Sequence, residues 1–168
     1  MKTERKLSRA EFVRRYGGVY EHSPWVAEAA WERGGGGVGA GELRGLLASC
    51  VDSADDDAKL ALICAHPDLA GRAAVRGELT ADSAGEQASA GIDRCTPEEF
   101  ERFRQLNDAY REKFGFPFVM AVRHSSRQQI LAEFERRLRN EAPAEMRTAL
   151  REIHEIARLR LEAMADVN

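Results

Sequence analysis

Helix-start signals recur along almost the whole chain, and they restrict its fold more than any other feature. Ser8 and Glu11 match a capping box, in which a hydroxyl and a carboxylate three residues later satisfy free N–H groups. Thr96, Pro97 and Glu99 form the strongest such signal, because proline also favours the first helical position. Each signal precedes a helical pattern of apolar residues, and together they predict an all-α protein.

The remaining segments fit the same fold class, a single-domain helical bundle over residues 1–168. The glycine run Gly34–Gly41 predicts a flexible surface loop, since glycine disfavours helix. The stretch FPFVMAV, residues 116–122, is the one short extended segment that we expect, buried between helices. Other helix boundaries are expected at Ser23 as the N-cap before Pro24, the acidic turn at 52–57, Gly91, Gly115, Ser125 or Ser126, and Pro143.

Composition and charge exclude several classes of protein. The 168 residues carry a net charge of only −3, without the basic excess of a nucleic-acid binder. No apolar run approaches the roughly 20 residues of a membrane-spanning helix, and the N-terminus lacks the apolar region of a secretory signal. Cys50, Cys64 and Cys95 are odd in number and widely spaced, which predicts buried reduced thiols. A cytoplasmic bacterial protein without nucleic-acid or membrane partners fits these features.

His66 is the first candidate for proton chemistry. It stands directly before Pro67, where an apolar helical run stops, and the residue before a proline is disfavoured in the α region. The helix should therefore end there and turn the imidazole out of the helical stripe. A helix C-terminus favours protonated histidine, which exchanges protons near neutral pH. A histidine that merely caps the helix would explain the same pattern.

Ser83 and Glu86 have two explanations. Their spacing matches a capping box at the start of a short helix that closes at Gly91, which would make both residues structural. The N-terminus of a helix also offers free N–H groups to a polar ligand, and Gln87 would project near it. The two roles are compatible.

Motifs for metals and cofactors are missing from the sequence. The four histidines form no HExxH pair, and Cys64 with His66 lacks a second pair of ligands. The glycine run lacks the Lys-Ser/Thr ending of a phosphate-binding loop. We therefore expect neither a metal nor an organic cofactor.

The final helix carries an apolar stripe that bears on two arginines. At about 100° per residue, Arg160 falls roughly 50° from the centre of the stripe, whereas Arg158 falls more than about 100° away. A buried arginine needs an anionic partner or a ligand. Alternatively, its stem lies on the apolar face and its head reaches solvent. The stripe recurs at three- and four-residue spacing: Met146, Leu150, Ile153, Ala157, Leu161 and Met164.

Five motifs occur along the chain in the order HSPWVAEAAW (22–31), AHPDLAG (65–71), LTADSAGEQASAGID (79–93), FGFPFVMAVR (114–123) and RLRL (158–161). Together they resemble one known family, the 2-oxo-4-hydroxy-4-carboxy-5-ureidoimidazoline (OHCU) decarboxylases. The resemblance covers nearly the whole chain and departs from the family pattern in the glycine-rich insertion at 34–41.

The resemblance implies a function and a set of site residues. The family is all-α, usually homodimeric and cofactor-independent, and it converts a small-molecule ureidoimidazoline to (S)-allantoin and CO₂, the last step in the conversion of urate to (S)-allantoin. By motif position, His66 would be the catalytic histidine and Glu86 its acidic partner. Arg160, at the family's Arg-Leu pair, would bind substrate. The other implied pocket residues are Pro67, Ser83 and Gln87, with the backbone around Val119 and Met120.

Two rival functions stay open at this point. A relative acting on a different ureide or imidazolinone would carry the same motifs, with selectivity set around Val119 and Met120. A non-catalytic helical binding protein would keep the fold without turnover. His66, Glu86 and Gln87 argue against the second rival, because binding alone does not require an acid/base pair.

Overall fold

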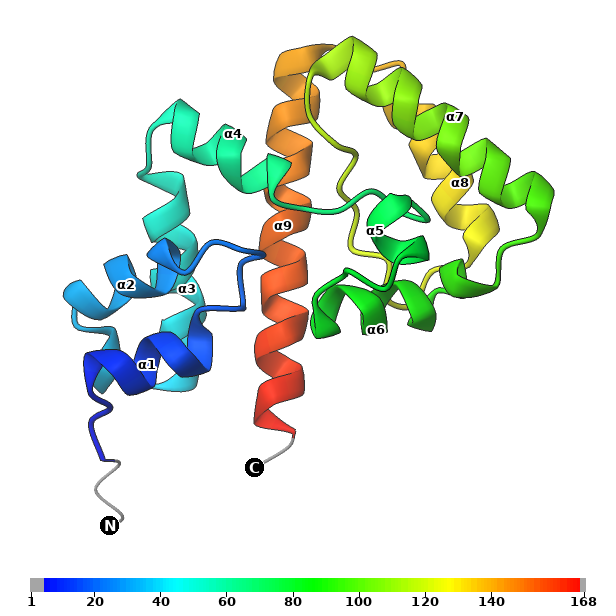
Figure 1. Ribbon diagram of the computed structural model, residues 1–168. Helices are drawn as coiled ribbons and strands as arrows, with labels where there is room; N and C mark the ends of the chain where they lie inside the picture. The colour runs from blue at the N-terminus through cyan, green and yellow to red at the C-terminus, as the bar shows by residue number, and fades with distance from the viewer. Residues whose placement is uncertain (1–4, 167–168) are drawn as a thin grey trace. The chain divides into compact units, whose positions relative to one another are not determined.

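The computed structural model describes residues 5–166, which form helices and connecting segments without a strand, as expected (Figure 1). The chain divides into two compact units. One holds the chain up to Ala65 and from Ala157 onward, and the other holds His66–Ile156. The boundary falls inside the last helix, α9 (Ala142–Ala165). The single domain expected over 1–168 stays a prediction.

None of the helices in the described range is both long and apolar enough to span a membrane.

The first unit is built mainly from four helices in which α2 packs against both α1 and α3. Its core is apolar and includes Phe12 of α1, Ala30 of α2 and Leu47 of α3, each at most 1% exposed. The capping box predicted at Ser8 and Glu11 is confirmed. The four helices are α1 (Arg9–Tyr16), α2 (Trp25–Glu32), α3 (Ala40–Asp52) and α4 (Asp56–Cys64).

The cap predicted at Ser23 is wrong. Helix α2 begins at Trp25, and its N-cap is Pro24, which has no side-chain hydrogen bond to offer. The Ser23 hydroxyl instead donates to the carbonyl of Glu21 at 2.8 Å. The serine therefore stabilises the preceding turn, because a hydroxyl can bond local backbone outside a helix as well as at its start.

The glycine run is more ordered than predicted. Residues Gly35–Gly37 form a short 3-10 helix, and Gly41 already belongs to α3. Gly35 is buried, and a Cβ atom there would lie 2.7 Å from the carbonyl oxygen of Ala30. Close packing against α2 therefore requires glycine at this position, and the expectation of a flexible surface loop over 34–41 is wrong for this part.

In the second unit, the capping box predicted at the start of α7 is confirmed. The Thr96 hydroxyl accepts from the Glu99 N–H, and the Glu99 carboxylate accepts from the Thr96 N–H. Gly115 ends α7 in the left-handed conformation, as predicted (φ 77°). Helices α7 and α8 pack together, and α8 begins at a capping box formed by Ser126 and Gln129. The elements here are α5 (Arg72–Val75), α6 (Ala81–Ser89), a 3-10 turn (Ile92–Arg94), α7 (Pro97–Phe114) and α8 (Arg127–Arg137).

The segment 116–122 crosses the second unit without regular secondary structure, as expected for a buried extended stretch. Phe116 and Phe118 contact Tyr110 edge-on, with ring centroids 5.9 and 5.5 Å apart. Phe118 also stacks on Phe134 of α8 at 3.8 Å. Aromatic packing therefore holds this segment between the helices.

The buried face of α9 differs in part from the predicted stripe. Ile153 and Ala157 are buried as expected, whereas the leucines and methionines of that stripe are half-buried. The residues under 9% exposure fall along a neighbouring line at three- and four-residue spacing: Glu145, Ala149, Ile153, Ile156, Ala157 and Arg160.

All three cysteines are free, but they are not all buried. Cys50 lies in the core, Cys95 is half-buried and Cys64 is exposed at the last turn of α4. The prediction of three buried thiols is therefore confirmed for Cys50, wrong for Cys64 and only partly correct for Cys95.

Candidate functional site

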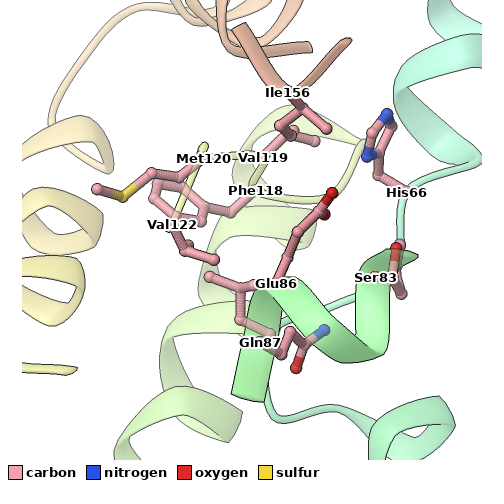
Figure 2. A pocket seen from close by; sticks show the side chains of 11 residues that line it. His66, Ser83, Glu86, Gln87, Phe118, Val119, Met120, Val122 and Ile156 are labelled. Atoms are coloured by element: carbon pink, nitrogen blue, oxygen red, sulfur yellow. The ribbon is translucent and has the colours of Figure 1, made fainter. Parts of the chain in front are cut away.

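A small cavity lies within the second unit, and seven of the eight predicted site residues line it. They come from three segments: the chain after α4, helix α6 and the segment 116–122. Figure 2 shows the labelled side chains around the cavity. Its lining comprises His66, Pro67, Leu69, Ser83, Glu86, Gln87, Phe118, Val119, Met120, Val122 and Ile156.

His66 follows the end of α4 by two residues. The helix ends at Cys64, as the His66-Pro67 pair predicts, and the imidazole is only 6% exposed. Its Nε2 atom is fully buried. A buried imidazole at a cavity wall is suited to proton transfer, because bulk water does not compete for its nitrogens.

Glu86 enters the cavity from α6, one helical turn after Ser83. Thr80, not Ser83, caps this helix, since the Thr80 hydroxyl accepts from the Ser83 N–H at 3.2 Å. The capping box proposed for Ser83 and Glu86 is therefore wrong. Positions three apart share one face of a helix, and in Figure 2 the Glu86 carboxylate is directed toward the side of the cavity that holds His66.

The side-chain amide of Gln87 holds the chain that follows His66. Its Oε1 accepts from the Ala70 N–H at 3.2 Å, and its Nε2 donates to the Asp68 carbonyl at 3.3 Å. In Figure 2 this amide points away from the Glu86 carboxylate. Gln87 thus acts on the loop carrying His66, a contact that spacing along the sequence does not reveal.

Helix α7 adds two more contacts to the same loop. Asn107 donates to the Leu69 carbonyl at 2.9 Å, and Arg111 pairs with the Asp68 carboxylate at 2.9 Å. The loop needs such support because Ala70 adopts a positive φ of 52°, which is unfavourable for a residue with a Cβ. Sequence analysis missed both α7 residues, because they lie far along the chain from their partners.

The opposite wall is apolar and backed by a buried ion pair. Phe118, Val122 and Ile156 contribute side chains to the cavity. Behind them Arg137, with no exposed surface, donates to the Val119 carbonyl at 2.6 Å. Arg137 follows Ile130 and Phe134 at four- and three-residue spacing along the buried face of α8, so the stripe argument applied to Arg160 would have found it.

Arg160, the eighth predicted site residue, belongs to the first unit. Its side chain is 5% exposed, whereas that of Arg158 is 27% exposed and pairs with Glu162. The prediction that Arg160 is the buried arginine is confirmed. Its guanidinium donates to the Glu21 carboxylate at 3.1 Å and to the Gly18 carbonyl at 3.2 Å. The anionic partner that burial demands is thus Glu21, and a role in substrate binding stays a prediction.

Chemically, the cavity combines an imidazole, a carboxylate and backbone groups with apolar walls. Within residues 5–166 no cluster of three or more His, Cys, Asp or Glu side chains could hold a metal ion. Low local polarity strengthens the interaction of each polar group with a bound anion or carbonyl. The arrangement suits acid/base chemistry on a small polar molecule.

Comparisons with known proteins all lead to one family. The family described as OHCU decarboxylase matches residues 5–162 of the chain. The 2-oxo-4-hydroxy-4-carboxy-5-ureidoimidazoline decarboxylase of Haloferax volcanii is 44% identical over 156 residues, covering 93% of this chain and 90% of that protein. The decarboxylase of the same name from Mus musculus is 39% identical over 151 residues, covering 90% and 84%.

Two solved structures share the fold. A crystal structure of (S)-allantoin synthase aligns with a TM-score of 0.75 and 33% identity, over 94% of this chain and 51% of that chain. This chain therefore spans about half of that protein. A crystal structure of OHCU decarboxylase in the presence of (S)-allantoin aligns with a TM-score of 0.73 over 89% and 96%. At 18% identity the second likeness concerns the fold alone.

We expect Gln87→Met to destabilise the loop after His66. The substitution keeps the volume but leaves the Ala70 N–H and the Asp68 carbonyl without their partner, which should lower the free energy of unfolding by about 2 kcal/mol. Urea unfolding measures the loss, and hydrogen exchange at the Ala70 amide should accelerate. Gln105→Met, on the exposed face of α7, is the matched control and should change stability by less than about 0.5 kcal/mol. Equal stability of the two variants would contradict the holding role.

Proposed function

The chain belongs to the OHCU decarboxylase family, and we propose that it converts 2-oxo-4-hydroxy-4-carboxy-5-ureidoimidazoline to (S)-allantoin and CO₂ in urate degradation. The observation that carries this proposal is the meeting of His66 and Glu86 at one small cavity, with the backbone of Val119 and Met120 across from them.

The proposed reaction needs no external electron sink. One ring carbon carries both the carboxylate and a hydroxyl, beside a C=N bond. When the bond to the carboxylate breaks, CO₂ leaves and its electron pair moves into the ring toward that C=N. The nitrogen of that C=N takes up a proton from an acid or from water, and the hydroxyl gives up its proton to become the ring carbonyl while the carbon that bears the ureido group receives one. Delivery of that proton to one face determines the (S) configuration.

We assign the proton transfers to His66 and Glu86. His66 acts as the general acid or base, and Glu86 either partners it or handles the hydroxyl and ureide protons. This assignment is supported by the fact that the two side chains reach the cavity from separate segments, His66 from the loop after α4 and Glu86 from helix α6. Each segment is fixed by its own contacts, by Gln87 for the loop and by the Thr80 cap for the helix.

The other polar groups orient the substrate in this proposal. Ser83 and the backbone around Val119 and Met120 hydrogen-bond its ring or ureide groups, and Pro67 and Gln87 complete the wall. Arg160 binds an anionic or carbonyl group, with its guanidinium held by Glu21. The Glu21 ion pair alone also explains why Arg160 is buried, so substitution must separate the two roles.

Turnover and its stereochemistry test the proposed function directly. With freshly generated substrate, we expect a fast circular-dichroism signal from optically active allantoin, and His66→Asn should lower the rate by roughly 10² to 10⁴. His124→Asn is the matched control, because His124 is exposed and asparagine tolerates its positive φ of 69°. Near-normal turnover by His66→Asn would exclude its proton-transfer role. Activity on another ureide alone would favour a relative with a different substrate. No turnover of either compound would favour a non-catalytic binding protein.

Arg160→Lys should impair turnover strongly, because a lysine keeps the charge but not the planar fork of donors. Arg158→Lys, two residues away on the same helix, is the control and should leave kcat/KM close to that of the parent. Steady-state kinetics on both variants measure the difference, with thermal unfolding to confirm that the introduced ammonium group still pairs with Glu21. A larger loss in Arg158→Lys would contradict the assignment.

We further propose a homodimer in the cytoplasm. Leu60, Val75 and Phe100 are large apolar side chains at least 39% exposed, which a second copy could cover. Sedimentation equilibrium should give twice the mass of one chain, and a single-chain mass at micromolar concentration would contradict the dimer.

The cytoplasmic location is supported by the free thiols at all three cysteines, which fit a reducing compartment. A bacterial source stays a prediction, since the relatives include archaeal and animal proteins.

A further inference from the structure

We infer that Arg137 is a positioning residue that turns the peptide between Val119 and Met120 so that the Met120 N–H faces the substrate cavity. The cavity would thereby gain a fixed backbone donor for a carbonyl or anionic group of the substrate. This inference rests on the proposed function for the identity of the ligand, but its geometric basis lies in a buried network outside the cavity.

Arg137 is held by a carboxylate that is itself held on two sides. Arg137 ends α8, and its Nε donates to Glu145 in the first turn of α9 at 2.5 Å, with both side chains completely buried. Glu145 also accepts from the Tyr110 hydroxyl at 2.7 Å and from Asn140 at 3.0 Å. Burial, followed by this hydrogen bond, raises the pKa of Tyr110, so its hydroxyl remains a donor. The carboxylate therefore fixes one edge of the guanidinium.

The guanidinium reaches the cavity wall through two contacts. It lies over the ring of Phe118, 4.3 Å from the ring centroid, and Phe118 is also held by stacking on Phe134. Its Nη1 donates to the Val119 carbonyl at 2.6 Å. Phe118 and Val119 both line the cavity, so Arg137 contacts the wall from behind without lining the cavity itself.

The Val119 carbonyl depends on Arg137 for its direction. Within the described range, residues 116–121 make no backbone–backbone hydrogen bond, so no ladder of strand or helix orients their peptides. The peptide bonds described are all trans, and a trans peptide points its C=O and its N–H to opposite sides. Because the Val119 carbonyl faces the core and Arg137, the N–H of Met120 faces the other way.

The side chain of Met120 agrees with this direction. In Figure 2 it extends away from His66, so Met120 can contribute backbone to the part of the cavity near His66 and Glu86. A preorganised backbone N–H is a favourable donor to a charge that develops on a substrate, because it needs no reorganisation during the reaction.

A purely structural role does not require this arginine. Replacing a buried ion pair by uncharged residues of similar volume often leaves stability unchanged or improves it. What such a replacement removes is a planar cation that serves a carboxylate and a carbonyl at fixed angles. Removing both charges together therefore separates a structural role from a positioning role. A structural role predicts unchanged catalysis, whereas a positioning role predicts a loss of catalysis.

The decisive variant is Arg137→Met combined with Glu145→Gln in the full chain. It leaves no unpaired buried charge, and the glutamine oxygen still accepts from Tyr110. We expect folded protein by circular dichroism, a loss of roughly 10²-fold in kcat/KM, and an unchanged shape of the pH profile set by His66 and Glu86. A folded double variant with the kcat/KM of the parent would overturn the inference.

Two matched variants isolate the contact with Val119. Arg136→Met removes the neighbouring arginine, which is exposed and paired with Glu133 on the same helix, and should leave kcat/KM unchanged. Tyr110→Phe removes a hydrogen bond to Glu145 but keeps Arg137 on the Val119 carbonyl. It should lower the melting temperature while kcat/KM stays near that of the parent. A proportional loss of activity and stability in all of these variants would show a structural role only and overturn the inference.

A readout without turnover separates this inference from the proposed function. In ¹⁵N-labelled protein the Met120 amide resonance should shift in the double variant and stay in place in Arg136→Met. If the parent does not convert the ureidoimidazoline, the proposed function fails, whereas the amide resonance still decides the role of Arg137. An unmoved Met120 resonance would overturn the inference. If the double variant does not fold, Arg137→Lys takes its place. We then expect a loss of about tenfold in kcat/KM, because lysine lacks the planar set of donors of the guanidinium.

Discussion

The cavity wall at Phe118 and Val119 is backed by one buried ion pair, between Arg137 at the end of α8 and Glu145 at the start of α9. Two fully desolvated charges are costly unless further hydrogen bonds compensate for the lost water. Tyr110 of α7 donates to the carboxylate and the carbonyl of Val119 accepts from the guanidinium, while the buried Nη2 of Arg137 has no hydrogen-bond partner among the described residues. The pair therefore connects three helices to the irregular segment that forms one wall of the cavity.

The opposite wall follows the same design with weaker contacts. The loop after His66 has no ladder of backbone hydrogen bonds, and side chains of Gln87, Asn107 and Arg111 hold its backbone and its one carboxylate. Both walls of the cavity are thus irregular chain that regular helices hold in place. Such a division suits catalysis, because loops offer free backbone groups while the helices limit their motion.

Local sequence signals predicted the helices well and their caps unevenly. Thr96 was assigned correctly, since proline and glutamate follow at the positions that a capping box requires. Ser83 was assigned wrongly, because Thr80 three residues earlier offers the same hydroxyl and the helix starts there. Ser23 failed for a related reason: a hydroxyl can serve a turn as readily as a helix, and local sequence does not choose between them.

By itself the sequence determined that the protein is all-α, that α4 must end before Pro67, and that Arg160, unlike Arg158, lies near the apolar stripe of α9. These follow from bonds and periodicities within a few residues of one helix. Only the tertiary structure placed His66 and Glu86 at one cavity, gave Arg160 its partner Glu21, and set Arg137 behind Val119. Those contacts join residues far apart in the chain, and packing, which depends on all the elements together, decides them.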